Sequence, residues 1–557
     1  MNKKSIIPFF ILSLIIVTIY VPFVFKGGFG PSDDLALLAD SGKKFSELVL
    51  GSITKPGHVS RPIYGLIQVF TLVTFGNNPI PYNILKLVLL FITVALLSYT
   101  VRTTIGLRAS WIFSFFASLP IFCSSHVFSS FQMGYLLSIL FWALSLFLLH
   151  GYIFGRRKIN YYLSFFFVLL ALLSCEIILP LLIVTALLPI VYLVHTQGRG
   201  SIGDLPGITL RFISPIILLS FGFYIFKVYL SKYYQIGEGT YGLSPVTMKS
   251  FLQGGYYFFT LVVEIPLMLI MVIPYLFEWE ILLLSILIVS FFMFLRKIGN
   301  ENELLFHKSN PSQERMGKQF VGIMFFSLVA CASIFFLSGY PAVTFGNYNK
   351  MMLPSFVLVC VLIGWGIDKL LMTRWIVVVM GVSILWTSSM VVQVRNFSDS
   401  WQIREKVLYD FATNINTTDL GIQPHIIACI PFFTKKNYNN EHVFWLTWDF
   451  SSGVKLYGSK KIIFVFPFCW QTLVNADYYP LHNINSQLTE QLENENLWYY
   501  EFDYSTNRSD LRKLDNYNAL EKQLRNVIDK KINYHPILFR QRIKMKLKGW
   551  IFERNII

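Results

Sequence analysis

The chain has 557 residues, of which 54% are hydrophobic and only 14% are charged, and its formal net charge is +16. Soluble domains carry about 25% charged residues, so this composition excludes an ordinary soluble enzyme or binding module. Apolar residues come in long runs, as helices that span a bilayer require. The positive charge is typical of cytoplasmic loops, and no soluble module with a recognition motif points to nucleic-acid binding.

Lys3 and Lys4 precede the first apolar run and place the N-terminus in the cytoplasm. The run is too long for a signal peptide and no A-x-A cleavage site follows it, so we expect a retained helix. Later Arg and Lys clusters should lie on the same side of the membrane, which fixes how the helices alternate. The sequence therefore predicts a mainly α, polytopic bundle of about eleven crossings. They cover residues 6–25, 83–101, 110–122, 132–153, 160–175, 178–195, 208–230, 279–296, 319–338, 352–372 and 375–394.

Two apolar segments, 62–75 and 256–273, do not fit this count. Treating both as crossings would put Arg102, Arg108 and the cluster at Arg156 on the wrong side. We therefore expect both to be amphipathic or half-buried segments at the outer interface. The resulting outer loops are residues 26–82, 231–278 and 338–351.

The chain divides at about residue 395 into a membrane domain, 1–395, and a more polar domain, 396–557. Alternating helical and strand patterns predict that the second is a small extracytoplasmic α/β domain. Cys429 and Cys469 could form one disulfide there. The basic tail, with Arg540 to Arg554 interleaved with aromatic residues, fits an amphipathic segment on an anionic surface and equally a solvated helix. The predicted elements are helices 399–415 and 519–528 and strands 425–432 and 461–466.

Several short motifs, in order along residues 1–395, together resemble the GT-C superfamily of membrane glycosyltransferases, which use polyprenyl-phosphate sugars. Within that superfamily the chain is similar to bacterial O-antigen-modifying, serotype-converting glucosyltransferases. It departs from the family's LSKE pattern at Cys175, where a basic residue is usual. The matching motifs are GFGPSDD at 28–34, HVSRPIY at 58–64, FG at 75–76, PYN at 81–83, LP at 119–120, His126 and LLSCE at 172–176.

Asp33 and Asp34 open the first outer loop, at the expected depth of a lipid phosphate. Glycosyl transfer needs a carboxylate that removes the proton of the acceptor hydroxyl, and we predict this catalytic role for at least one of the pair. The alternative is a helix N-cap, with Ser32 or Asp33 capping a helix over 35–50. The two carboxylates could also bind a divalent ion, although the sequence has no metal cluster and we expect none.

Arg61, with His58 and Lys350, is the candidate for holding the donor phosphate. A guanidinium can meet growing negative charge with two hydrogen bonds. The alternative for Arg61 and Lys350 is contact with ordinary lipid headgroups, and for His58 a surface position.

Glu176, His126 and Tyr64 are candidates for the substrate pocket. Glu176 could pair with Arg61 or with the acceptor sugar, or lie exposed between two helices. His126 could equally be a polar turn residue, and Glu264 interrupts an apolar run that could face the same cavity.

The resemblance implies a hexosyltransferase of the bacterial inner membrane with a periplasmic C-terminal domain. Its donor would be an undecaprenyl-phosphate hexose such as glucose, its acceptor a lipopolysaccharide O-antigen or other surface polysaccharide, and its mechanism inverting. A polysaccharide polymerase or ligase using a diphosphate-linked donor is a rival, although residues 231–255 hold neither Arg nor His. A flippase or transporter is another, although no internal repeat supports it.

Overall fold

The computed structural model divides into two compact units. Unit 1 comprises Met1–Gly30, Ser41–Ser398 and Tyr438–Asn440, and unit 2 comprises Pro31–Asp40, Asp399–Asn437 and Glu441–Ile557. A segment of the expected first outer loop, 31–40, therefore belongs to unit 2. The structure describes residues 3–30, 33–39, 43–54, 61–130, 132–197, 205–233, 248–305, 311–338, 342, 344, 347–371, 373–421, 425–429, 447–457, 464–467, 497–503 and 508–514.

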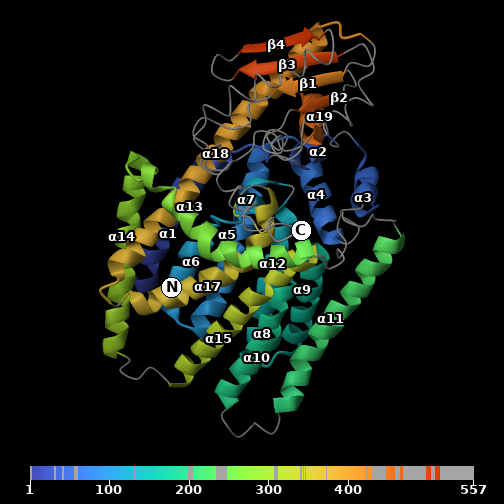
Figure 1. Ribbon diagram of the computed structural model, residues 1–557. Coiled ribbons are helices and arrows are strands. Elements are labelled where there is room, and N and C mark those ends of the chain that lie inside the picture. Colours follow the sequence, from blue (N-terminus) through green and yellow to red (C-terminus); the bar gives the residue numbers. More distant parts are fainter. Residues whose placement is uncertain are drawn as a thin grey trace. The chain divides into compact units, whose positions relative to one another are not determined.

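Unit 1 is a bundle of helices (Figure 1). Within the described residues, ten helical segments are long and apolar enough to cross a membrane, so the chain is a multi-pass membrane protein. Their elements are α1 (Lys3–Lys26), α5 (Pro79–Thr104), α8 (Met133–Gly155), η1 with α10 (Glu176–Leu181, Leu182–Gln197), α11 (Leu205–Tyr233), α12 to η4 (Met248–Phe259, Thr260–Glu264, Ile265–Ile270, Ile273–Tyr275), α14 (Trp279–Leu305), α15 with α16 (Pro311–Ala330, Ala332–Ser338), η5 with α17 (Asn347–Met352, Leu353–Leu370) and α18 (Ile376–Thr417).

Shorter helices complete unit 1, and one of them corrects the expected topology. The crossing expected over 110–122 is an eleven-residue helix, only about 16 Å long at 1.5 Å per residue. The crossing expected over 160–175 is a helix of 17 residues, at the lower limit of the length that can span a bilayer. The segment 62–75, which we did not count as a crossing, is a helix of 14 residues. It is shorter than the roughly 20 residues that a crossing needs. These helices are α3 (Phe45–Thr54), α4 (Pro62–Phe75), α6 (Leu107–Ala117), α7 (Ser125–Phe128) and α9 (Lys158–Ser174).

The segment 256–273, which we predicted to be interfacial, is long and apolar enough to be a candidate membrane span. It lies in a helical stretch, Leu252–Tyr275, of 24 residues. A π-helical turn, η3, interrupts its α-helical hydrogen bonding at Thr260–Glu264. Such single π-turns widen the helix locally and often occur at functional sites.

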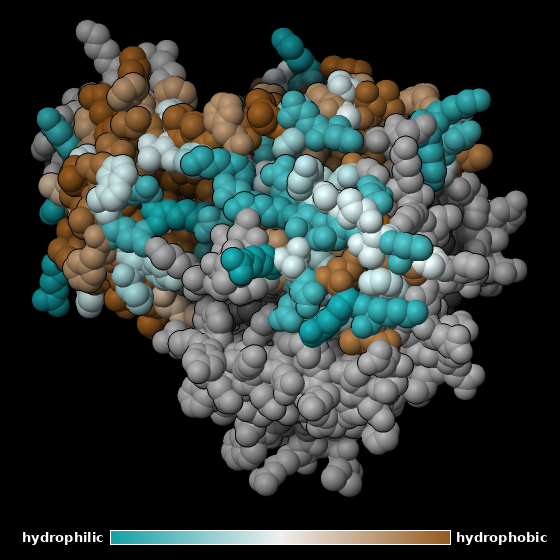
Figure 2. Space-filling view, turned by 90° about the horizontal axis from the view of Figure 1, so that it is seen from above, coloured by the Kyte–Doolittle hydropathy of each residue, from teal (hydrophilic) through white to brown (hydrophobic). Residues whose placement is uncertain are grey.

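The helices of unit 1 pack through aromatic side chains. Phe116 and Phe356 from α6 and α17 both contact the indole of Trp386 on α18, with ring centroids 5.1 and 6.3 Å apart. The Trp386 indole N–H donates to the carbonyl of Leu119 at 2.9 Å, which satisfies the polar atom of a buried ring. On the face drawn in Figure 2, hydrophobic side chains gather in the upper and left parts of the described surface, and hydrophilic ones cross its middle and also reach its edge. Large apolar side chains such as Phe221 and Phe277 are exposed, as a lipid-facing surface requires.

Unit 2 contains a small sheet and helical segments. Helix α18 is one helix of 42 residues that continues beyond Ser398, where we had predicted a separate helix over 399–415. Five apolar residues recur here at helical spacing, of which Trp401 is half-buried and the others are buried, namely Ile403, Val407, Leu408 and Phe411. The described strands are β1 (His425–Cys429), β2 (Phe464–Pro467), β3 (Leu497–Asp503) and β4 (Arg508–Lys513).

The strand order is β2-β1-β3-β4, with β1 parallel to both neighbours and β4 antiparallel to β3. Asp410 on α18 accepts hydrogen bonds from the Tyr500 hydroxyl of β3 at 2.7 Å and the Asn414 amide at 2.9 Å. Helix α19 (Thr447–Leu456) packs on α2 (Asp33–Leu38), because Gly453 lies against Leu35 and Leu408 with no room for a side chain.

Candidate functional site

Arg61 and Glu176 meet at one end of the unit 1 bundle. Arg61 immediately precedes α4, and Pro62 at the first position of that helix has no N–H to satisfy. Glu176 begins η1, where α9 has ended at Ser174. The guanidinium donates from Nε to Oε2 of Glu176 at 2.8 Å and from Nη2 to Oε1 at 2.7 Å. Glu176 was expected to pair with Arg61 or with the acceptor sugar, or to lie exposed, and in the structure it pairs with Arg61. The two hydrogen bonds fix the orientation of both side chains.

Two lysines complete a cationic cluster, which we define as Arg61, Tyr135, Glu176, Lys227 and Lys350. Lys227 on α11 donates to Glu176 Oε1 at 2.8 Å. Arg61 Nη1 donates to the Tyr135 hydroxyl at 3.1 Å. Lys350 Nζ lies 5.3 Å from the centre of the Tyr135 ring, and the Arg61 guanidinium carbon lies 5.6 Å from it. Three cations from three segments thus converge on one carboxylate and one aromatic ring.

Tyr64 supports this cluster by packing against it. Its ring meets that of Tyr135 edge-on, with centroids 5.8 Å apart. A Cβ on Gly134 would lie 1.6 Å from the Tyr64 ring, so only glycine allows α4 to approach α8 this closely. Tyr64 is buried, and its place beside Tyr135 is consistent with a substrate-pocket neighbour.

A hydrogen-bond network holds the segment that carries Lys350. The Asn349 side chain accepts from the backbone N–H of Ser125 at 3.1 Å and donates to the carbonyl of Thr344 at 3.2 Å. The Thr344 hydroxyl lies 3.5 Å from Glu264, which also accepts from the Tyr256 hydroxyl. Glu264 is buried in the π-turn and is linked to the cluster through this network.

Burial makes the cluster's charges interdependent. Burial alone would lower the pKa of Arg61, but the neighbouring Cys175 and Glu176 outweigh it and hold the pKa well above its usual value. The guanidinium is therefore permanently charged. Together the cluster's side chains carry three positive charges and one negative, an arrangement suited to receiving an anionic group such as a phosphate.

His126 is fully buried in α7. Burial lowers its pKa to about 3, the carbonyl of Cys123 opposes this shift, and Lys86 adds to it. Lys86 is itself fully buried and donates to the carbonyl of Phe128 at 3.1 Å. His126 is therefore a neutral, enclosed side chain, which favours the polar-turn interpretation over a direct contact with substrate.

Asp33 and Asp34 lie in α2, which belongs to unit 2. The helix begins at Asp33 and ends at Leu38, and the single helix expected over 35–50 is in fact two, α2 and α3. Asp34 is buried, whereas the side chain of Asp33 is not described. His58, Cys469, the side chain of Cys429 and the basic tail fall outside the described residues.

No group of three or more His, Cys, Asp or Glu side chains that could hold a metal ion occurs in the part of the chain that the structure describes. Tyr135 and Lys227 were not among the site residues predicted from the sequence. Lys227 did carry a signal, because a single Lys inside the apolar run of α11 is costly in a bilayer and is therefore a candidate for function. Cys175, where the family pattern has a basic residue, is buried, and the second cation at Glu176 is Lys227.

Protein-family models, curated proteins and solved structures were compared with this chain, and none matches it.

Proposed function

We propose that this protein is a membrane glycosyltransferase that takes a hexose from a polyprenyl-phosphate donor. The observation that carries the proposal is the convergence of Arg61, Lys227 and Lys350 around Glu176 and Tyr135. Such a cluster at the end of a helix bundle can bind a lipid-linked phosphate whose hydrocarbon tail stays in the bilayer. The resemblance to the GT-C superfamily over residues 1–395 supports the same donor class.

The reaction would be a single displacement. The acceptor hydroxyl oxygen attacks the anomeric carbon while the bond from that carbon to the phosphate oxygen breaks. The phosphate leaves with the bonding electron pair, and the cations of the cluster stabilise its added charge. The resemblance implies that Asp33 or Asp34 removes the hydroxyl proton, and a carboxylate is a general base suited to this step. Inversion at the anomeric carbon follows from one in-line attack.

The acceptor we propose is an O-antigen or another surface polysaccharide, with transfer at the periplasmic face of the bacterial inner membrane. The polar region after Ser398, which includes the four-stranded sheet, would then be a periplasmic α/β domain. The sidedness rests on the distribution of Lys and Arg in the sequence.

The test is sugar transfer in membranes from a labelled polyprenyl-phosphate hexose, with Asp33→Asn, Asp34→Asn and the double variant. We expect the double variant to lose at least about 100-fold in rate, the usual contribution of a general base. Asp419→Asn is the matched control, because Asp419 caps the N–H of Gly421 in unit 2 and has no proposed role. Full activity in the double variant at normal expression would refute the base assignment. Lipid flipping in proteoliposomes without transfer would favour the transporter alternative.

A further inference from the structure

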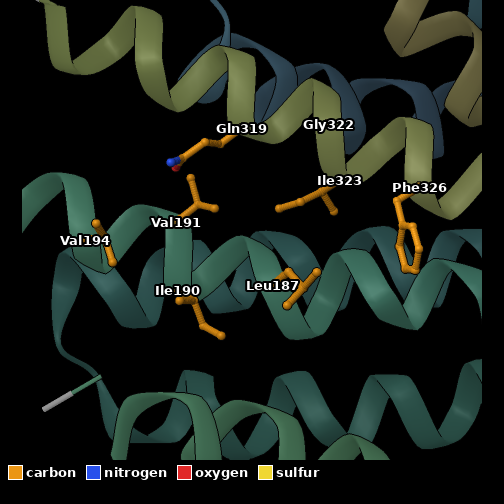
Figure 3. Close-up of a pocket in the computed structure, with 8 residues that line it drawn as sticks. All are labelled: Leu187, Ile190, Val191, Val194, Gln319, Gly322, Ile323 and Phe326. Atoms are coloured by element: carbon orange, nitrogen blue, oxygen red, sulfur yellow. The ribbon is translucent and has the colours of Figure 1, made fainter. Parts of the chain in front are cut away.

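An apolar groove of about 440 Å³ lies between α10 and α15. Figure 3 shows side chains from both helices pointing into it, with Gln319 and Val194 toward one end and Leu187 and Phe326 toward the other. This volume is within the range of small-molecule sites, about 300–1,000 Å³. Both helices belong to segments long and apolar enough to span a membrane, so the groove lies between two candidate membrane spans.

The α15 side of the groove continues as one stripe toward a charged end. Arg315, Gln319, Gly322 and Phe326 follow each other at intervals of three and four residues, which places them on one face of the helix. Arg315 is exposed near the start of α15, where the positive end of the helix dipole also favours an anion. Its neighbour Glu314 is paired with Lys318 at 2.9 Å. The stripe therefore begins with a cation, continues through the polar Gln319 and ends with Gly322 and the apolar Phe326.

The length of this stripe matches one leaflet. Phe326 lies eleven positions after Arg315, about 16 Å along a helix axis. Half of the bilayer hydrocarbon is about 15 Å. A phospholipid with its phosphate at Arg315 would therefore extend an acyl chain to about the level of Phe326.

We propose that this groove binds one anionic phospholipid, with the headgroup phosphate at Arg315 and an acyl chain along Gly322. The site is separate from the cationic cluster and does not depend on the proposed transferase activity. Helix α15 also packs against η1, which carries Glu176, so the bound lipid supports the helices that position the cluster.

The structure offers a matched pair of variants for the test. A Cβ on Gly322 meets nothing within 4 Å, so the first atom of the new side chain in Gly322→Leu fits without a clash, and the substitution adds bulk to the groove. A Cβ on Gly222 of α11 also meets nothing within 4 Å, so Gly222→Leu changes helix propensity equally at a position away from the groove. Thermal unfolding in detergent verifies that both variants are folded.

The measurement is native mass spectrometry of the delipidated, full-length protein titrated with phosphatidylglycerol or phosphatidylcholine. The wild type should bind one phosphatidylglycerol about tenfold more tightly than phosphatidylcholine, and Gly322→Leu should lower that affinity about tenfold. Gly222→Leu should bind as the wild type does, and Arg315→Gln should bind both lipids equally. Equal binding by the two leucine variants, or no preference for the anionic lipid in the wild type, would overturn the proposal.

Discussion

Arg61 and Glu176 are 115 positions apart in the chain and form a two-bond ion pair, Nε to Oε2 at 2.8 Å and Nη2 to Oε1 at 2.7 Å. Arg61 is buried, and the side chain of Glu176 is 21% exposed. Solvent therefore reaches part of the Glu176 side chain, whereas the Arg61 side chain is shielded from it. Glu176 neutralises the charge of Arg61. It also forms an ion pair with Lys227, which links α11 to the cluster.

Replacing Glu176 with Gln should destabilise the protein by about 3 kcal/mol, because it leaves a buried guanidinium without its anion. The measurement is unfolding of the purified protein in detergent, as a cycle with Arg61→Gln and the double variant. Since the second substitution removes a charge that is already unpaired, the double variant should lose less than the sum of the single variants. If the losses in unfolding free energy of the two single variants added up to that of the double variant, Arg61 and Glu176 would not stabilise each other.

Lys227→Met and Lys350→Met should each weaken the binding of polyprenyl phosphate about tenfold, because each removes one charge-assisted contact to an anion. Binding is measured on the purified chain with the lipid phosphate in mixed micelles. Lys318→Met is the control, since Lys318 is exposed and pairs only with Glu314 in the described contacts. If all three variants bound like the wild type, the cluster would not be the phosphate site.

Gly134→Ala should lower the free energy of unfolding by about 1–3 kcal/mol, the usual effect of adding an atom to a packed interior. The reason is local, because the new Cβ would collide with the Tyr64 ring at 1.6 Å. Gly255→Ala is the matched control, as its Cβ meets nothing within 4 Å and alanine is the better helix former. In the Gly134→Ala background, Tyr64→Ala should cost less than it does in the wild type, and failure of this partial rescue would argue against the collision.

The buried His126 should make stability fall as pH falls. Its pKa is lowered to about 3 in the folded protein, against about 6.5 for an unfolded chain. Above pH 6.5 both states are neutral and the group has no effect, whereas between pH 6.5 and 3 the unfolded state binds the extra proton. Lowering the pH from 7 to 5 should therefore cost about 2 kcal/mol through this residue.

The check for this pH effect is thermal unfolding at pH 7 and pH 5 for the wild type and His126→Gln. Glutamine does not titrate, so the variant should lose less stability than the wild type over the same interval. An identical loss in both proteins would mean that His126 is accessible to protons in the folded state.

The membrane class, the α-helical bundle and the individual polar residues worth testing could be read from the sequence. Long apolar runs are sufficient for this, because a bilayer forces each crossing to satisfy its own backbone hydrogen bonds within a helix. Arg61 and Glu176 also stood out, since charged residues beside apolar runs are costly without a partner. Helix lengths were less well predicted. Hydropathy alone did not distinguish the eleven-residue helix Leu107–Ala117 from a span. The distribution of Lys and Arg led us to exclude 256–273, although Leu252–Tyr275 is long and apolar enough to be a span.

The partners of these residues required the tertiary structure. Residues 61, 135, 176, 227 and 350 lie on different segments, and no spacing along the chain predicts that they meet. Packing decides it, as when the missing side chain of Gly134 admits Tyr64 beside Tyr135. Tyr135 and Lys227 entered the site only through such contacts, and the apolar groove between α10 and α15 exists only because two helices are adjacent. The sequence by itself thus determined that this chain spans a bilayer and which charged side chains have a high free-energy cost there. The fold decided which of those charges stabilise one another, because that depends on distances between helices rather than on positions along one.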